Sequence, residues 1–116
     1  MANVLSTSRY KNVKFDLTTA VATKIYTCPA LMTTFVSSIL VAEDTGNADT
    51  ITVTITNGGS VFSVFKVKAV AANTTIELLS NDLILVSGDI VNVTAATANR
   101  LHVIASLVEV PKTTTA

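Results

Sequence analysis

The feature that most constrains the fold of this chain is a period-2 alternation of β-branched apolar residues with small polar ones. It is clearest between residues 50 and 57, where Ile51, Val53 and Ile55 would face one way and threonines the other. Branched side chains fit a pleated strand better than a helix. Because such alternation recurs along the chain and no long 3.6-residue pattern competes with it, the sequence predicts an all-β protein.

The alternation, together with the turn signals that interrupt it, predicts about eight strands. Asn57-Gly58-Gly59 suits a tight turn, because Asn and Gly accept positive φ, so residues 50–57 and 60–70 form the clearest predicted hairpin. Ser87-Gly88-Asp89 and Ala98-Asn99-Arg100 predict two further turns. The expected strands are residues 13–17, 23–28, 33–42, 50–57, 60–70, 74–79, 90–95 and 101–110.

Strands spaced about ten residues apart and joined by turns are typical of two packed antiparallel sheets. We therefore expect a single antiparallel β-sandwich, and specifically a jelly-roll-like one. The two ends of the chain differ from its middle. Residues 1–12 are predicted to be an extended, polar N-terminal arm, residues 13–110 the β-sandwich domain, and residues 111–116 a threonine-rich C-terminal tail behind a strand-stopping proline.

The surface of the predicted sandwich carries unusually little charge. Charged residues make up 14% of the 116-residue chain, the formal net charge is zero, and threonine occurs nineteen times. This composition argues against nucleic acid as a partner, because phosphate recognition needs clustered Lys and Arg. A neutral surface also protects poorly against self-association. The strand at residues 101–110 is apolar on both sides, so it should be central or covered by another subunit.

Residues that could carry chemistry are few and form no recognisable pattern. Cys28 and His102 are the single cysteine and the single histidine, so one chain cannot supply a zinc site of three or four Cys and His ligands. A nucleophile–base pair of these two residues is conceivable, but no spacing favours it. We expect Cys28 to be a small packed residue, His102 a packed or interface residue, and the chain not to be an enzyme.

The acidic segment Glu43-Asp44-Thr45-Gly46-Asn47-Ala48-Asp49 superficially resembles a calcium loop. Its acidic residues do not follow the EF-hand order, and no helices flank it. We predict an ordinary solvated loop between strands, with a bound divalent cation as the less favoured alternative, and assign no catalytic residue, metal or cofactor. Asp82 and Asp89 are predicted turn residues. The aromatic content of 5%, without tryptophan, argues against a sugar-binding module.

The first residues of the sequence lack the basic and apolar parts of a secretory leader. No window approaches the run of about eighteen apolar residues that a membrane span requires. The expectation is a chain made in the cytoplasm, without a membrane partner.

A set of segments carries a family resemblance through its order and spacing. The segments are Ile25-Tyr26-Thr27-Cys28-Pro29-Ala30, Val36-Ser37-Ser38-Ile39-Leu40-Val41, the threonine-rich strand, Val86-Ser87-Gly88-Asp89-Ile90-Val91-Asn92-Val93 and Val103-Ile104-Ala105-Ser106-Leu107-Val108-Glu109. Over residues 20–110 they resemble small β-rich virion structural proteins of tailed phages, particularly marine and cyanobacterial phages. Members of this family often carry Tyr-Thr-Val-Pro-Ala, and Cys28 stands where that valine is usual.

The resemblance implies a place in the virion, after synthesis in the host cytoplasm, and no catalytic residues. The function we expect is that of a capsid decoration (cement) protein, which binds the outer shell and stabilises it through repeated subunit contacts. Its partners would be further copies of itself, as a homotrimer or another homo-oligomer, and virion proteins such as the major capsid protein. Alternatives are a tail, neck or fibre-associated adaptor and a ligand- or sugar-binding β-module. We expect subunit contacts at residues 1–12 and 101–110.

Overall fold

The computed structural model describes residues 8–111, and this part of the chain consists of strands and their connections. No helix within it is long and apolar enough to cross a membrane. The strands are β1 (Arg9–Asp16), β2 (Thr23–Thr27), β3 (Met32–Glu43), β4 (Asp49–Asn57), β5 (Ser60–Val70), β6 (Thr74–Glu77), β7 (Leu83–Leu85), β8 (Ile90–Ala95) and β9 (Leu101–Pro111). The all-β prediction is confirmed.

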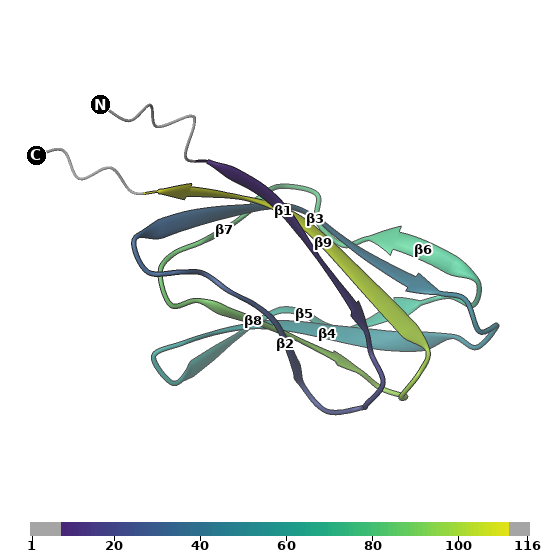
Figure 1. Cartoon of the computed structure of the whole chain (residues 1–116). Coiled ribbons are helices and arrows are strands. Elements are labelled where there is room, and N and C mark those ends of the chain that lie inside the picture. Colours follow the sequence, from purple (N-terminus) through teal and green to yellow (C-terminus); the bar gives the residue numbers. More distant parts are fainter. Residues whose placement is uncertain (1–7, 112–116) are drawn as a thin grey trace, which may run out of the picture.

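The strands form two antiparallel sheets that lie one above the other (Figure 1). Sheet A has the order β1-β9-β3-β6, with β7 also paired to β3, and sheet B has the order β2-β8-β4-β5. The pairs are nested: β4 pairs β5, β3 pairs β6, β2 pairs β8 and β1 pairs β9. A long antiparallel ribbon rolled into two sheets in this way is a jelly roll, which confirms the predicted sandwich.

The core lies between the sheets and is built by the predicted alternation. On β4, Ile51 and Val53 point inward and are fully buried, whereas the threonines that alternate with them are partly exposed. On β9, every second residue from Leu101 is buried in the same core. β9 lies between β1 and β3, so the strand predicted to be central is central. The turn of the β4–β5 hairpin uses Gly58 and Gly59 at φ values of 60° and 88°, as predicted.

The first strand is longer than predicted, and this corrects the boundary of the N-terminal arm. β1 begins at Arg9 and not at residue 13, because its backbone pairs with β9 from Arg9 opposite Glu109 to Asp16 opposite His102. Residues 9–12 show no apolar alternation, so only this tertiary pairing makes them a strand. Residues 1–7 of the predicted arm and residues 112–116 of the predicted tail lie outside the described residues.

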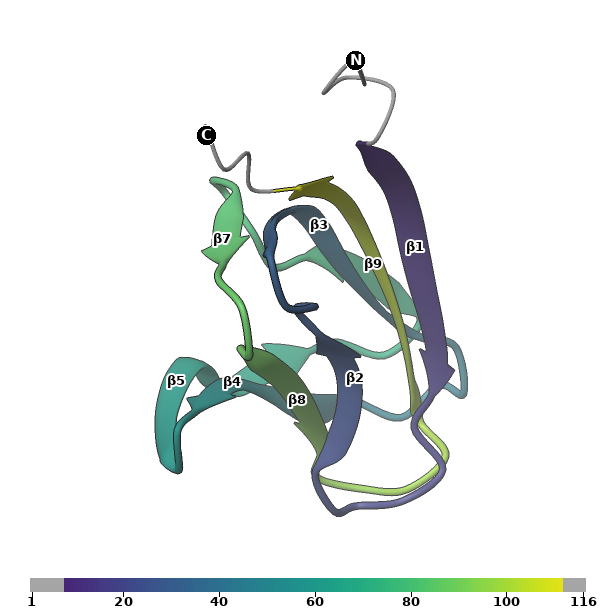
Figure 2. The same cartoon turned by 60° about the vertical axis from the view of Figure 1, so that its left-hand side comes forward.

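Strand β7 was not predicted, because three residues are too short to show a period. β6 and β7 share one edge of β3, and β7 lies beside the other end of that strand (Figure 2). Between β6 and β7 the Glu77 carboxylate binds the open edge of β3, where it accepts hydrogen bonds from the Ile39 amide at 2.8 Å and from the Ser38 hydroxyl. β3 also contains a bulge at Ser37, which has no partner on β9.

Candidate interaction surface

The structure separates the two residues that could have formed a nucleophile–base pair. Cys28 is 1% exposed, and its sulfur lies 3.3 Å from the Thr34 hydroxyl in the core. The Tyr26 hydroxyl contacts both Thr34 and Glu109, so Cys28 lies near the Glu109 end of β9. His102 lies on the outer side of the same strand, seven residues from Glu109. Seven residues of strand span about 23 Å. Cys28 and His102 therefore do not share a site.

His102 lies instead between two exposed aspartates. Its Nε2 is 3.4 Å from Asp16 Oδ1, and its Nδ1 is 3.9 Å from Asp44 Oδ2. Among the described residues, no group of three or more His, Cys, Asp and Glu side chains is arranged to hold a metal ion. The His102 cluster is a polar part of the outer surface of sheet A.

Glu43 differs from the solvated loop residue that was predicted. It ends β3 with a side chain only 1% exposed, and its carboxylate accepts hydrogen bonds from the amides of Thr45, Gly46, Asn47 and Asn73 at 2.9–3.2 Å and from the Thr45 hydroxyl. Burial alone would raise the pKa of Glu43, but these donors outweigh it and lower the pKa from 4.5 to about 2. The carboxylate thus holds the β3–β4 loop to the start of β6.

Replacing Glu43 with glutamine is expected to lower stability at neutral pH and to flatten its acid dependence. The folded pKa of Glu43 lies below the unfolded value, so its contribution is complete above about pH 4.5 and is lost as the pH falls through about 2. Urea unfolding measured from pH 7 to pH 2 tests this. Asp44→Asn removes an equal charge from the exposed neighbour and should keep the wild-type dependence of the free energy of unfolding on pH. A wild-type slope in Glu43→Gln would contradict the assignment.

Three further carboxylates hold connections in the same manner. Asp49 Oδ2 accepts the Thr97 amide at 3.1 Å, and Asp89 Oδ2 accepts the Val86 amide at 2.9 Å. Burial opposes ionisation of Glu77, but hydrogen bonds from Ser38, Ile39 and Leu79 lower its pKa. Asp89 therefore lies in a turn, as predicted. These acidic groups bind the protein's own backbone.

A buried polar network connects the two sheets near the end of β9. The Tyr26 hydroxyl donates to Glu109 Oε2 at 2.5 Å and lies 2.8 Å from the Thr34 hydroxyl. Glu109 is 2% exposed, and Lys11 Nζ approaches the same oxygen at 3.6 Å from the solvent side. Burial, followed by the hydrogen bond to Glu109, raises the pKa of the Tyr26 phenol. The Tyr26 phenol is therefore protonated at neutral pH and can donate its hydrogen bond to Glu109.

The most distinctive surface is the outer face of sheet A, defined here as the outward side chains of β1, β9, β3, β6 and β7. An apolar row crosses four of these strands, since Tyr10 is paired with Val108, Val108 with Phe35, and Phe35 with Ile84. Tyr10 is 87% exposed. Paired residues of antiparallel neighbours point to the same side, so the row is continuous across the sheet.

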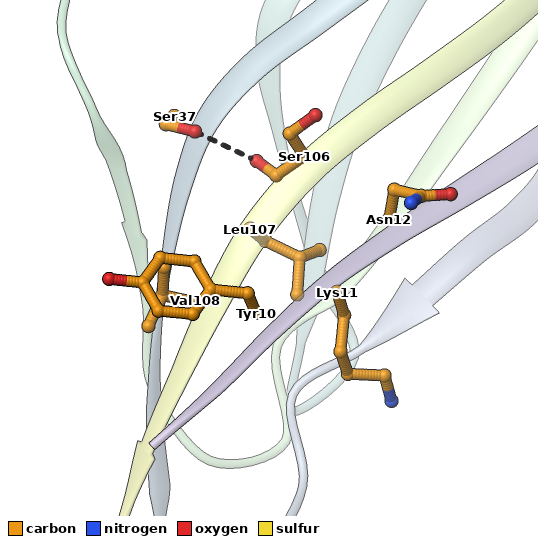
Figure 3. A pocket seen from close by; sticks show the side chains of 7 residues that line it. All are labelled: Tyr10, Lys11, Asn12, Ser37, Ser106, Leu107 and Val108. Atoms are coloured by element: carbon orange, nitrogen blue, oxygen red, sulfur yellow. Dashed lines mark hydrogen bonds between the residues drawn. The ribbon is translucent and has the colours of Figure 1, made fainter. Parts of the chain in front are cut away.

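Beside this row the face is hollowed into an open depression of about 420 Å³ (Figure 3). Tyr10 and Val108 lie together on one side of it, and Asn12 and Ser106 contribute polar side chains to its lining. The bulge at Ser37 contributes to the hollow, and the Ser37 hydroxyl donates to the Ser106 carbonyl at 3.2 Å. The lining of the depression is therefore mixed, with polar side chains next to the apolar row.

A second exposed apolar surface lies on sheet B. β5 is the edge strand of that sheet, and Figure 2 shows it at the outer side of the molecule. Val61, Phe62 and Val67 on this strand are each more than half exposed. Val67 has a φ of 52°, which is unusual for a β-branched residue, and its amide donates to the Thr52 hydroxyl at 3.0 Å. We call residues 61–67 the β5 edge.

Sequence reasoning identified only part of these surfaces. The outward apolar side of β9 was recognised from its alternation, but Tyr10 was placed in an arm and Ile84 in no strand at all. Neither residue has a sequence signal of its own, because each joins the row only through pairing with a strand distant in the sequence.

Comparison with known proteins bears on the fold through one solved structure. No family model and no curated protein matches the chain. Among solved structures, the chain is similar to a protein of Bacillus endospore appendages, described as a novel family of disulfide-linked pili. The sequence identity is 15%, the TM-score is 0.56, and the match covers 91% of this chain and 88% of the other. At this identity the likeness concerns the two-sheet fold.

Proposed function

We propose that this chain is a non-enzymatic structural subunit of a tailed-phage virion, where many copies decorate the capsid shell. The observation that carries the proposal is the exposure of large apolar side chains in two separate places, the outer face of sheet A and the β5 edge. The apolar row on sheet A is continuous across four strands, and contiguous exposed apolar surface marks sites of contact with other proteins. In a chain with only 14% charged residues, such surfaces favour attachment to neighbours.

The two surfaces suit a subunit that bridges its neighbours. They belong to different sheets, so a partner on one leaves the other free for a second partner. Repeating weak contacts over a symmetric shell gives strong net attachment, because each bound copy raises the effective concentration of the next contact. Bridging of this kind is how a decoration protein would stabilise a shell.

The distribution of polar groups supports a structural role. Glu43, Asp49, Glu77 and Asp89 bind backbone amides, and Cys28 and His102 lie in different parts of the fold. The segments that resemble phage virion proteins contribute to both sheets. The first of these segments contains Tyr26 and Cys28, and the last contains Glu109, which accepts a hydrogen bond from Tyr26. The resemblance is what favours a virion over another repeating particle.

The contacts of this subunit would be non-covalent. The single cysteine, Cys28, is buried in the core, and a disulfide between copies would require the sandwich to open. In this respect the chain differs from the disulfide-linked pili whose fold it resembles. Packing of exposed apolar surface would be the main source of attachment.

Labelling of purified virions with an antibody against this chain tests the proposal. Label spread over the whole shell is expected for a decoration protein. Label confined to one vertex or to the tail would favour the tail, neck or fibre alternative, and unlabelled particles would contradict a virion role.

In binding to shells of the major capsid protein, Phe62→Ser is expected to weaken attachment about tenfold or more, because exposed aromatic residues dominate contact energies. Val21→Ser, an exposed apolar residue outside both surfaces, is the matched control.

A further inference from the structure

We propose that the outer face of sheet A packs against the same face of a second copy, about a two-fold axis that runs parallel to the strands midway between β9 and β3. This inference names the partner of one of the two surfaces, and it rests on the proposed function for its biological use. A two-fold dimer is one of the homo-oligomers expected from the sequence, although not the homotrimer that was named first.

The outward side chains of sheet A form rows whose composition changes along the strands. The apolar row, over β1, β9, β3 and β7, is Tyr10, Val108, Phe35 and Ile84. The next row, which crosses the depression, is Asn12, Ser106 and Ser38. The third row, over β1, β9, β3 and β6, is Lys14, Ile104, Leu40 and Glu77. The fourth row is Asp16, His102, Ala42 and Thr75.

Rotation about the proposed axis places each row on the same row of the second copy. It exchanges β9 with β3 and exchanges β1 with the edge formed by β6 and β7, while positions along the strands are kept. In the apolar row, Tyr10 then faces Ile84 of the second copy. In the polar row, Ser106 faces Ser38 of the second copy. Each contact occurs twice, as a two-fold interface requires.

One pair of opposite charges on the face meets about this axis. The third row begins with Lys14 on β1 and ends with Glu77 on β6, so Lys14 of each copy faces Glu77 of the other. Lys14 is exposed, and its ammonium donates to Asn12 Oδ1 on the same face at 2.6 Å. The Glu77 carboxylate is kept charged by the amides it accepts, and it remains exposed at the sheet edge. The two ends of the row therefore attract.

The other axis within the face, perpendicular to the strands, gives a mismatch. It would place the apolar row on the fourth row, so that Tyr10 would lie over Asp16 and Val108 over His102 of the second copy. Apolar side chains would then cover a carboxylate and an imidazole, which would lose their solvent. Complementarity thus selects one axis.

The proposed packing is compatible with the geometry of twisted sheets. Stacked sheets lie about 10 Å apart with their strands about 30° from parallel. The two-fold rotation doubles the angle between strand and axis, so strands inclined by about half of 30° to the axis give this crossing angle between the two sheets. At the sheet edges the inclination shifts facing residues by about one residue along the strand, which a lysine side chain spans.

Light scattering of the purified full chain after size exclusion, over a series of concentrations, tests the contact. We expect a dimer that dissociates on dilution. Tyr10→Ser should abolish it, and Lys14→Glu should weaken it about tenfold or more, because two symmetry-related attractions become repulsions. Lys68→Glu makes the same charge change on exposed β5 and should leave the dimer unchanged. Monomer at every concentration, a trimer, or a dimer that neither variant weakens would overturn the proposal.

Cross-linking provides a second measurement on folded protein. Ser106 lies next to the axis, so Ser106→Cys should be joined to its copy by a short bismaleimide. Thr54→Cys, on the outer side of sheet B, should not, and neither should wild type, since Cys28 is buried. Equal cross-linking of Thr54→Cys would also overturn the two-fold contact. Both measurements use only the purified chain, so their failure leaves the virion labelling result standing.

Discussion

Replacing Leu85 with alanine is expected to lower the free energy of unfolding by about 2–5 kcal/mol, the usual cost of truncating a buried leucine. Leu85 is the last residue of β7, and its side chain is 0% exposed. The only strand that pairs with β7 is β3, from Thr34 opposite Leu85 to Val36 opposite Leu83. A cavity beside β7 would therefore weaken both the core and the pairing that holds this short strand.

The next residue along the chain is a matched control. Val86 is 49% exposed, so Val86→Ala should change stability by less than about 0.5 kcal/mol. Urea unfolding at low protein concentration measures both variants in the monomer. If the two substitutions cost the same, the inward placement of Leu85, and with it the position of β7 in sheet A, would be wrong.

The strands that could be predicted are those whose own residues alternate. The bounds of β5 and β8 coincide with those predicted, because each has a run of alternating or branched residues between clear turns. The start of β1 at Arg9 and the whole of β7 could not be found in the same way. Their residues show no period, and only pairing with β9 and β3 makes them strands.

The acidic residues show a second limit of sequence reasoning. Glu43 is the last residue of β3, and Glu109 lies two residues before the end of β9. A carboxylate at such a place is ordinarily solvated. Each accepts a hydrogen bond from a distant part of the chain, the Asn73 amide for Glu43 and the Tyr26 hydroxyl for Glu109, although the other donors to Glu43 lie in the loop that follows it. The two distant donors are 30 and 83 residues away in the sequence. No local pattern encodes such a match.

The network around Glu109 yields the second large expected effect. Tyr26→Phe should lower the free energy of unfolding by about 3 kcal/mol, because it leaves a buried carboxylate without its closest donor. Lys11 approaches the same oxygen only at 3.6 Å and from solvent. Tyr10→Phe removes an equivalent hydroxyl from an exposed ring and should have almost no effect on the monomer. Urea unfolding at pH 7 compares the two.

The pH dependence and a double variant separate the hydrogen bond from simple packing. The pKa of Tyr26 is raised in the folded state, so its contribution is complete below about pH 10 and decreases as the pH rises above that value. The difference between wild type and Tyr26→Phe should therefore narrow in alkali. Replacing both partners, as Tyr26→Phe with Glu109→Leu, should recover much of the lost stability, since no unpaired carboxylate remains. If the double variant is less stable than Tyr26→Phe alone, Glu109 has another buried partner, and the hydrogen bond from Tyr26 is not its main stabilising contact.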